Sequence, residues 1–296
     1  MSIGIMITIK LWGGLGNQLF QYAYGYQMAK KLETGIVLDT SWFYKQNLRS
    51  PDILQFNIKY DCVEQLCKFN KKIGVINKQF INRSIRVLGV SRFKLGKYNY
   101  LKETRYRYGQ KFASYALDNT FLDGYWQCPL YFEQVKNDLL QMYTINNLSE
   151  GVLELGEELR SQDSVAVHVR RGDYPKKKTP FSRFVSLGKE YYKKAVECVL
   201  DKIDSPSFYI FSNDMQDALD MLNPSISGFI KKIGLKTNYL DEWYLMKCCR
   251  HQIIGNSSFS WWPAYLNGYE KKMVVAPKKY LGNDNILCDN WIQIDF

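Results

Sequence analysis

Residues 5–18, I-M-I-T-I-K-L-W-G-G-L-G-N-Q, place a strand-like run directly before a glycine-rich turn. The run at 5–12 is mostly apolar and is typical of a buried strand. Residues 17–32 then carry apolar side chains at helical spacing, and residues 36–38 return to a β-like run. Strand, glycine turn, helix and strand in this order predict a βαβ unit in a parallel sheet.

The same order of elements returns in the second half of the chain. Strands are expected at 164–169, 208–211, 229–233, 252–255 and 273–276. Helices are expected between and after them at 189–200, 215–222, 242–249 and 261–267. This alternation predicts an open α/β sheet with helices on its faces.

A domain boundary is expected in the segment 144–163, which is acidic, has helical spacing and lacks any strand pattern. We therefore expect one domain over residues 1–150 and a second over residues 151–296. The predicted fold class is α/β, with two Rossmann-like domains facing a cleft.

The glycine-rich turn is a candidate ligand site, because Gly13, Gly14 and Gly16 let backbone N–H groups approach a ligand at the start of a helix. A plain structural turn explains the glycines equally well. Leu19 stands where the dinucleotide pattern G-x-G-x-x-G needs its third glycine or alanine, and the lysine of a P-loop is missing. Neither of these nucleotide motifs is therefore present.

A basic cluster, H-V-R-R-G-D-Y at 168–174, ends the first strand of the second domain. His168 and Arg170 share one face of an extended strand, and Arg171 points the opposite way. A guanidinium at a strand end can bind a diphosphate through two hydrogen bonds, which makes Arg170 the functional candidate. Arg171 and Asp173 are explained at least as well by a structural salt bridge.

Two further polar clusters follow expected strands. The stretch N-S-S-F-S-W-W at 256–262 offers hydroxyls and N–H groups at a helix start, which suits an anion, although a helix cap with a hydrophobic staple gives the same pattern. The stretch F-S-N-D at 211–214 ends in Asp214, whose carboxylate could accept hydrogen bonds from the N1–H and N2–H₂ groups of a guanine.

Several motifs are missing. No two aspartates lie two positions apart, so the D-x-D metal–diphosphate motif of many sugar transferases is absent, and only two histidines exist, His168 and His251. The small number of histidines excludes a histidine-rich zinc site. The G-x-S-x-G elbow of many hydrolases is also absent from the sequence. If the chain handles a nucleotide sugar, protein cations such as Arg170 must replace the metal.

The net charge of +11 is concentrated in one segment, residues 68–111, which holds thirteen Lys or Arg and one acid, Glu103. Such a segment attracts phosphate-bearing partners, but a solvated, mobile insertion explains it equally well. Its apolar residues between 80 and 93 also allow an amphipathic helix on a membrane surface. Seven scattered cysteines and the lack of a long apolar run favour a cytoplasmic protein with reduced thiols, peripheral at most on the inner membrane.

Three stretches together, G-G-L-G-N-Q-L-F-Q-Y at 13–22, H-V-R-R-G-D-Y at 168–174 and N-S-S-F-S-W-W-P-A-Y-L-N at 256–267, resemble the alpha-1,2-fucosyltransferase family in order and spacing. The resemblance runs over nearly the whole chain. It implies a GT-B-type fold, a GDP-fucose donor, inversion and no metal or other cofactor. Pro263, where the family more often has glycine, and the basic insertion at 68–111 depart from the pattern.

The resemblance also implies residue roles. The carboxyl-terminal domain would hold the nucleotide, with His168 and Asp214 on the guanine and Arg170 on the diphosphate. The phosphate and ribose cradle would be completed by Asn256, Ser257, Ser258 and Phe259. The transferred sugar would be faced by Asn17 and Gln18, together with the turn at Gly14 and Gly16.

The expected acceptor is the 2-hydroxyl of a galactose in an oligosaccharide or lipid-linked glycan. Three carboxylates near motif ends, Asp39, Asp123 and Asp173, are candidates for a general base, and each also has a structural explanation. Transfer from another GDP-sugar, or O-fucosylation of a protein, remains open. A nucleic-acid-binding protein that uses residues 68–111 is a remote alternative, and it leaves the three motifs unexplained.

Overall fold

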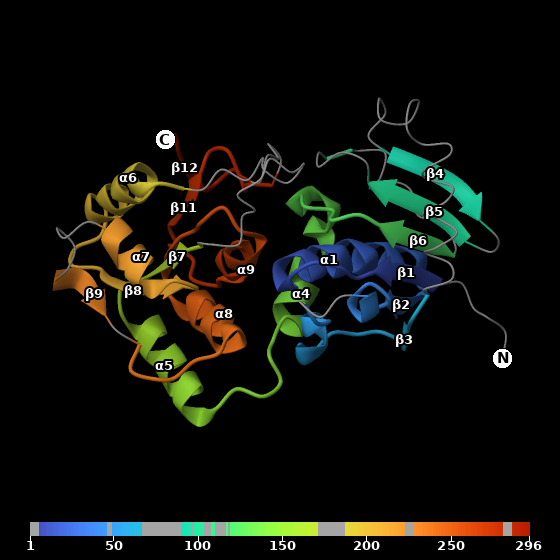
Figure 1. Cartoon of the computed structure of the whole chain (residues 1–296), viewed down its shortest axis with the longest axis horizontal. Coiled ribbons are helices and arrows are strands. Elements are labelled where there is room, and N and C mark those ends of the chain that lie inside the picture. The colour runs from blue at the N-terminus through green and yellow to red at the C-terminus, as the bar shows by residue number, and fades with distance from the viewer. Residues whose placement is uncertain are drawn as a thin grey trace. The chain divides into compact units, whose positions relative to one another are not determined.

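The computed structural model describes residues 6–45, 49–66, 90–95, 98–103, 108–109, 117, 119–170, 187–222, 228–231, 233–280 and 286–296. The chain forms two compact units, Met1–Asn146 and Asn147–Phe296. Each unit is built around its own sheet (Figure 1). The division falls inside the segment 144–163, where the sequence places the boundary.

The amino-terminal unit contains a six-stranded sheet in the order β3-β2-β1-β6-β5-β4. The strands are β1 (Met6–Lys10), β2 (Gly35–Asp39), β3 (Cys62–Glu64), β4 (Val90–Leu95), β5 (Tyr98–Glu103) and β6 (Thr120–Asp123). The helices are α1 (Leu15–Leu32), α4 (Lys136–Met142) and four short 3-10 turns, η1 (Phe43–Lys45), η2 (Asp52–Gln55), η3 (Pro129–Tyr131) and η4 (Glu133–Val135). All pairs in this sheet are parallel except β4–β5.

The βαβ unit read from residues 5–38 is present as β1, α1 and β2. Helix α1 begins two residues earlier than the apolar spacing indicates, because the carbonyl of Gly14 already accepts hydrogen bonds from the N–H groups of Asn17 and Gln18. Glycine is one of the residues that tolerate this N-cap position.

The described parts of the basic segment 68–111 include two strands. Residues 90–95 and 98–103 form the antiparallel pair β4–β5, so an amphipathic helix does not extend over 90–93. That part of the membrane-helix interpretation is wrong. Most of residues 68–89 and 104–111 lie outside the described residues.

Helix α1 packs very closely on β1. A Cβ atom placed on Gly25 would overlap the Cγ1 and Cδ1 atoms of Ile9, which is itself 1% exposed. The glycine is therefore required by the approach of the helix to the sheet, even though glycine is unfavourable inside a helix.

The carboxyl-terminal unit holds a second six-stranded sheet, in the order β12-β11-β10-β7-β8-β9, with parallel pairing throughout. Its strands are β7 (Ser164–Val169), β8 (Ser207–Ser212), β9 (Ile230–Lys231), β10 (His251–Ile253), β11 (Val274–Pro277) and β12 (Ile292–Ile294). Its helices are α5 (Glu150–Ser161), α6 (Lys189–Leu200), α7 (Met215–Met221), α8 (Tyr239–Cys248) and α9 (Ser258–Leu266). Strand β12 carries too few apolar residues to be read from the sequence.

Two hydrophobic clusters cover this sheet. One gathers α6 and α7 against alternate residues of β7 and β8, and the other gathers α5 and α8 against the residues between them. Val165 and Val167 belong to the first cluster and Ala166 to the second, as the two-residue alternation of a strand requires. The sheet is therefore doubly wound, as the sequence predicts. Among the described helices, none combines the length and the apolar character needed to cross a membrane.

Replacing Gly25 by alanine should destabilise the amino-terminal unit. Overpacking typically costs about 1–3 kcal/mol, which outweighs the ~1 kcal/mol that alanine adds to a helix. Urea unfolding should show this loss for Gly25→Ala, and the loss should shrink in the double variant Gly25→Ala with Ile9→Val. Gly151→Ala in α5 is the matched control, since its Cβ would meet Leu235 at an ordinary 3.6 Å. Additive effects of the two substitutions would contradict the assigned contact.

Candidate functional site

The strand order in the carboxyl-terminal unit reverses at β7. From β7 the chain runs to β8 and β9 on one side, and later to β10, β11 and β12 on the other. Ligands of open α/β sheets bind at such a reversal, outside the carboxyl ends of the strands. The carboxyl ends of β7, β8 and β10 carry the clusters read from the sequence, namely the described residues 168–170 of the first cluster and the clusters at 211–214 and 256–262. The topology therefore brings all three clusters to one edge.

His168 lies near the end of β7 and is 6% exposed. Its carbonyl accepts a hydrogen bond from the hydroxyl of Tyr192 at 3.1 Å. A Cβ on Gly255 would lie 2.8 Å from the same carbonyl oxygen and 3.4 Å from Nδ1, so only glycine fits beside this histidine. The ring centre of Phe259 is 5.9 Å away. His168 is thus held by β7, β10 and the start of α9.

The imidazole of His168 is neutral. Burial, and then the charge of Arg170, lower its pKa to about 3. Its Nδ1 atom is buried and has no hydrogen-bond partner in the described part of the chain. Arg170 directly follows β7 and is half-buried. The end of β7 therefore presents the cation of Arg170 near the neutral ring of His168. These are the two residues that the sequence places on a common face of the strand.

The segment 256–259 leads into α9. Asn256 and Ser257 are 4% and 7% exposed, whereas Ser258 and Phe259 are half-buried. The Ser257 hydroxyl accepts the N–H of Phe259 at 3.3 Å as the N-cap of α9, and its carbonyl accepts the hydroxyl of Tyr280 at 2.6 Å. The helix cap, which the sequence allows as the structural alternative to an anion site, is present. It leaves Ser258 and Phe259 as the members of the cluster that reach the surface most.

Asp214 follows β8 and is exposed. Its Oδ1 atom accepts the N–H of Asp217 at 3.1 Å as the N-cap of α7. Ser212, which pairs with Val169 of β7, exchanges hydrogen bonds with the Asp214 backbone. The carboxylate is thus fixed at the strand end next to His168, and the cap uses one of its two oxygens.

In the turn after β1 of the amino-terminal unit, some residues are accessible to a ligand and others are buried. Gly13 adopts a φ of 80°, and nothing lies within 4 Å of a Cβ built on Gly14. Asn17 is half-buried, and its Oδ1 atom accepts the amide of Gln127 at 2.9 Å. Gly16 is buried in the first turn of α1. Gly14 and Asn17 are therefore the members of this cluster that a ligand can approach.

Gln18, expected to face the transferred sugar, points into the protein instead. It is 0% exposed. Its Nε2 atom donates to the carbonyls of Gly13 at 3.1 Å and Ser50 at 2.9 Å, and its Oε1 atom accepts the N–H of Ile53 at 3.1 Å. Because both amide donors and the acceptor are used inside the fold, Gln18 positions the turn and does not contact substrate.

Two of the three candidate general bases are committed to structure. Asp39 is 0% exposed, and its Oδ1 atom accepts the N–H groups of Ser41 at 3.1 Å and Leu66 at 3.0 Å. Asp123 accepts Lys10 Nζ at 3.1 Å and the hydroxyl of Tyr100 at 2.5 Å. Neither fits a base that must leave one face open to an acceptor. Asp173 and its expected partner Arg171 lie outside the described residues.

Sequence reasoning missed a carboxylate, Glu103, at the end of β5. Its Oε2 atom accepts the N–H groups of Tyr125 at 2.7 Å and Trp126 at 3.0 Å. Burial raises its pKa to about 7, against the effect of these two hydrogen bonds. The signal was available in the sequence, because Glu103 is the one acid in the basic segment 68–111.

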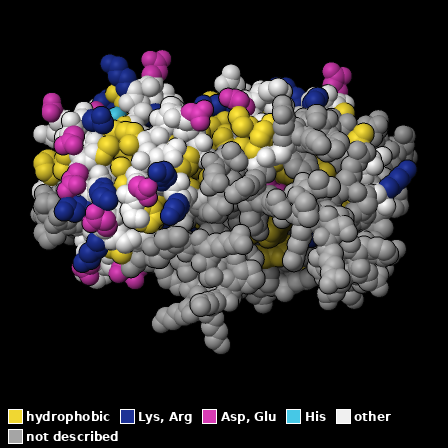
Figure 2. Space-filling view, turned by 90° about the horizontal axis from the view of Figure 1, so that it is seen from above, with side chains coloured by type: hydrophobic (Ala, Val, Ile, Leu, Met, Phe, Trp, Pro, Cys, Tyr) yellow, Lys and Arg dark blue, Asp and Glu magenta, His cyan; other side chains and the backbone are white. Residues whose placement is uncertain are grey.

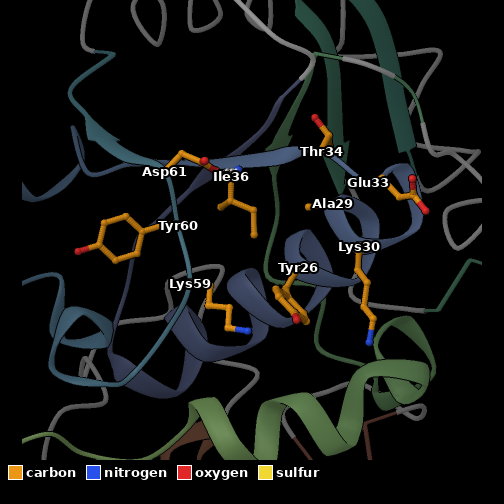
Figure 3. Close-up of a pocket in the computed structure, with 9 residues that line it drawn as sticks. All are labelled: Tyr26, Ala29, Lys30, Glu33, Thr34, Ile36, Lys59, Tyr60 and Asp61. Atoms are coloured by element: carbon orange, nitrogen blue, oxygen red, sulfur yellow. Dashed lines mark hydrogen bonds between the residues drawn. The ribbon is translucent and has the colours of Figure 1, made fainter.

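A cavity of about 410 Å³ lies elsewhere in the amino-terminal unit (Figure 3). It is lined by the end of α1, including Lys30, by Thr34 and Ile36 at the start of β2, and by residues 59–61 before β3. These residues are at the amino end of β2, whereas the glycine turn follows the carboxyl end of its parallel neighbour β1. The cavity contains none of the residues singled out from the sequence.

The described surface on the left of Figure 2 belongs to the carboxyl-terminal unit. Lysines, arginines and acids are interspersed over it, so this face carries no patch of a single sign. Among the described residues, no three His, Cys, Asp or Glu side chains are grouped as a metal ion would need.

The pH dependence of stability should report the buried state of His168. An ordinary histidine has a pKa of about 6.5, and the folded value is about 3, so the stability due to the neutral ring is present above pH 6.5 and is lost as pH falls toward 3. Between pH 7 and pH 5 the loss is about 2 kcal/mol. Urea unfolding of His168→Asn should show a correspondingly shallower loss than the unchanged chain. Equal slopes for the two proteins would contradict a neutral, buried His168.

Sequence comparison finds proteins that are similar to this chain over nearly its whole length. A profile described as Glycosyl transferase family 11 matches residues 6–295. The chain is 30% identical to the O-antigen biosynthesis glycosyltransferase WbnK of Escherichia coli, over 96% of this chain and 99% of that protein. It is 27% identical to an alpha-1,2-colitosyltransferase of Escherichia coli, over 98% and 99%. Mouse galactoside alpha-(1,2)-fucosyltransferase 2 is 28% identical over 56% of this chain and 48% of that one.

Solved structures show the same architecture. Fucosyltransferase NodZ from Bradyrhizobium aligns with a TM-score of 0.50 and 15% identity, over 88% of this chain and 91% of that one. A mutant of Arabidopsis thaliana FUT1 in complex with GDP aligns with a TM-score of 0.50 and 10% identity, over 91% and 70%. These likenesses, with the two parallel-sheet units, confirm the predicted GT-B-type fold class.

Proposed function

Because the chain belongs to glycosyl transferase family 11, we propose that it transfers L-fucose from GDP-β-L-fucose to the 2-hydroxyl of a galactose-containing glycan, with inversion and without a metal ion. The motif resemblance stated from the sequence is confirmed at the level of the family, and the chain is a glycosyltransferase. The choice of a 1,2 linkage is supported by relatives named alpha-1,2-colitosyltransferase and galactoside alpha-(1,2)-fucosyltransferase.

The observation that carries the proposal is the pairing of a neutral His168 with the cation Arg170 at the reversal of strand order. A nucleoside diphosphate needs a positive charge for its phosphates and hydrogen-bonding groups for its base. A positively charged imidazole at His168 would attract the phosphates as well, and the site would then distinguish the phosphates from the base less sharply. Burial of His168 keeps its ring neutral, so that Arg170 carries the positive charge of this pair.

The proposed donor site uses the clusters at the three strand ends. His168 and Asp214 bind the guanine, with the Asp214 carboxylate accepting hydrogen bonds from N1–H and N2–H₂. Arg170 binds the diphosphate through two hydrogen bonds. The amino-terminal end of α9, at Ser258 and Phe259, adds its positive partial charge. Asn256 and Ser257, which are buried to the same degree as His168, complete the proposed phosphate and ribose cradle together with Ser258 and Phe259.

In the proposed reaction the bond between fucose and GDP breaks through an oxocarbenium-like state while the acceptor hydroxyl attacks the opposite face of the sugar. Negative charge grows on the leaving diphosphate as the bond breaks. A fixed cation at that place stabilises the transition state more than the ground state. Arg170 and the start of α9 supply this stabilisation, so protein groups take the part that a metal ion has in other sugar transferases.

Guanine recognition is tested by isothermal titration calorimetry in EDTA. We expect GDP and GDP-fucose to bind at micromolar concentration and UDP to give no heat, because the Asp214 carboxylate suits guanine and not uracil. Binding of GDP that requires added metal would overturn the metal-independent mechanism. Preference for UDP would overturn the assignment of the donor.

Arg170→Ala should lower the rate of transfer by about 10²–10³, by analogy with the loss of one oxyanion-hole donor. The product is quantified by mass spectrometry, and its linkage by methylation analysis. Lys193→Ala on α6 is the matched control, because its side chain is 55% exposed on the helix surface. An Arg170→Ala enzyme that keeps more than half of its activity, with unchanged circular dichroism, would show that Arg170 does not bind the diphosphate.

A second candidate function is transfer of another sugar from a GDP donor. It is favoured by the alpha-1,2-colitosyltransferase relative, which aligns over 98% of this chain. Turnover of a panel of GDP-sugars on one galactoside acceptor separates the two candidates. The donor with the highest kcat/KM identifies the sugar, and the proposed guanine site is common to both.

A further inference from the structure

Two stacked aromatic rings at the carboxyl edge of the amino-terminal sheet have no part in the proposed donor site. Trp12 follows β1 and Tyr125 follows β6, and these strands are neighbours. Their ring centres are 3.9 Å apart with an interplanar angle of 26°. Both residues are half-buried. The edge therefore presents a partly exposed aromatic surface.

The Trp12 side of this surface is held by a buried glutamine. Gln21 of α1 is 0% exposed. Its Oε1 atom accepts a hydrogen bond from the backbone N–H of Trp12 at 3.1 Å, and its Nε2 atom donates one to the backbone carbonyl of Trp12 at 3.1 Å. These two hydrogen bonds satisfy the backbone of Trp12 beyond the end of β1, and they fix the backbone that carries the indole.

The Tyr125 side is held by Glu103 and Trp126. The Glu103 carboxylate accepts the N–H groups of both Tyr125 and Trp126. Trp126 adopts a φ of 56°, and its ring is buried at 4.6 Å from the ring of Tyr24. A Cβ on Gly124 would lie 2.5 Å from Glu103 Cβ, so the preceding position accepts only glycine. Tyr125 is thus the outward residue of a tightly fixed turn.

This arrangement has a cost in stability. A left-handed backbone at a residue other than glycine costs about 1–3 kcal/mol. The buried Nε1–H group of Trp12 has no acceptor in the described part of the chain, which costs about 1–3 kcal/mol. A turn needed only to connect β6 to η3 would avoid the first cost, and a residue without a buried side-chain N–H group at position 12 would avoid the second. The cost is explained if the surface binds a ligand.

The surroundings of the aromatic pair suit a sugar. The Asn17–Gln127 hydrogen bond joins the segments that follow β1 and β6, with Asn17 five residues after Trp12 and Gln127 two residues after Tyr125. An aromatic face beside amide groups matches a pyranose ring, which has one face of C–H groups and a rim of hydroxyls. In β-galactose the axial 4-hydroxyl leaves C3–H, C4–H and C5–H together on one face.

We propose that the Trp12–Tyr125 pair is the platform on which the galactose ring of the acceptor stacks, with Asn17 and Gln127 binding its hydroxyls. The identity of the sugar rests on the proposed function, whereas the platform itself rests on the geometry of this unit. Glu103 and Gln21 are positioning residues, because they act through the backbone of Tyr125 and Trp12.

The test compares Tyr125→Leu with Tyr125→Phe in the full chain. Leucine keeps an apolar side chain but removes the ring, so the affinity for methyl β-D-galactopyranoside, measured by saturation-transfer NMR, should fall about 10-fold. Phenylalanine retains the ring and should bind within about 3-fold of the unchanged chain. In turnover, Tyr125→Leu should raise the KM for the galactoside and leave the affinity for GDP unchanged.

The outcomes separate the platform from the proposed function. Equal galactoside affinity in Tyr125→Leu and the unchanged chain overturns the platform even when GDP-fucose is turned over. Failure of the unchanged chain to bind GDP overturns the proposed donor, while loss of galactoside binding in Tyr125→Leu still supports the platform. If Tyr125→Leu does not fold by circular dichroism, Trp12→Leu takes its place, with Trp12→Phe as the control that keeps a ring. Loss of galactoside binding in Trp12→Leu alone is the expected result, and equal binding in Trp12→Leu and the unchanged chain overturns the platform.

Discussion

The amino-terminal unit depends on two buried glutamine side chains in the first turns of α1. Gln18 and Gln21 are both 0% exposed, and all of their hydrogen bonds described above go to backbone groups of residues 12–13 and 50–53. Removal of either amide would leave several buried backbone groups without partners, each at a cost of about 1–3 kcal/mol. The glycine turn, and everything aligned to it, keeps its position because these amides are satisfied.

The two units have similar sheet topologies but carry different side chains at the carboxyl ends of their strands. Each has a central first strand, β1 or β7, with neighbours that continue the chain on both sides, so each gathers loops at one edge. In the carboxyl-terminal unit the described part of this edge carries the cation Arg170, a neutral histidine and a helix start. In the amino-terminal unit it carries aromatic rings and amides, beside carboxylates that are bonded within the fold. The cation agrees with a donor that bears phosphates, and the aromatic rings agree with a sugar acceptor.

Much of the fold could be predicted from the sequence, because long apolar runs and helical spacing determine β1, α1 and the series from β7 to β11. Two short strands escaped prediction: β3 and β12 have three residues each, too few for any periodicity to be visible. The residues of the proposed donor site could be grouped from the sequence because parallel strands end at a shared edge, whereas their roles follow from the family resemblance. The direction of a single side chain could not be found in the same way. Gln18 turns inward because acceptors and donors from residues 50–53 lie there, and Asp39 and Asp123 are bound by groups distant in sequence.

The turn at 124–126 also limits how this protein can evolve. Gly124 has no room for a side chain, and Trp126 is fixed by its left-handed backbone and by burial, so substitutions at both positions are selected against for reasons of folding. Position 125 between them is half-buried and needs neither glycine nor a left-handed backbone. A lineage under pressure to decorate a different glycan can therefore exchange this one side chain while the scaffold around it stays constant.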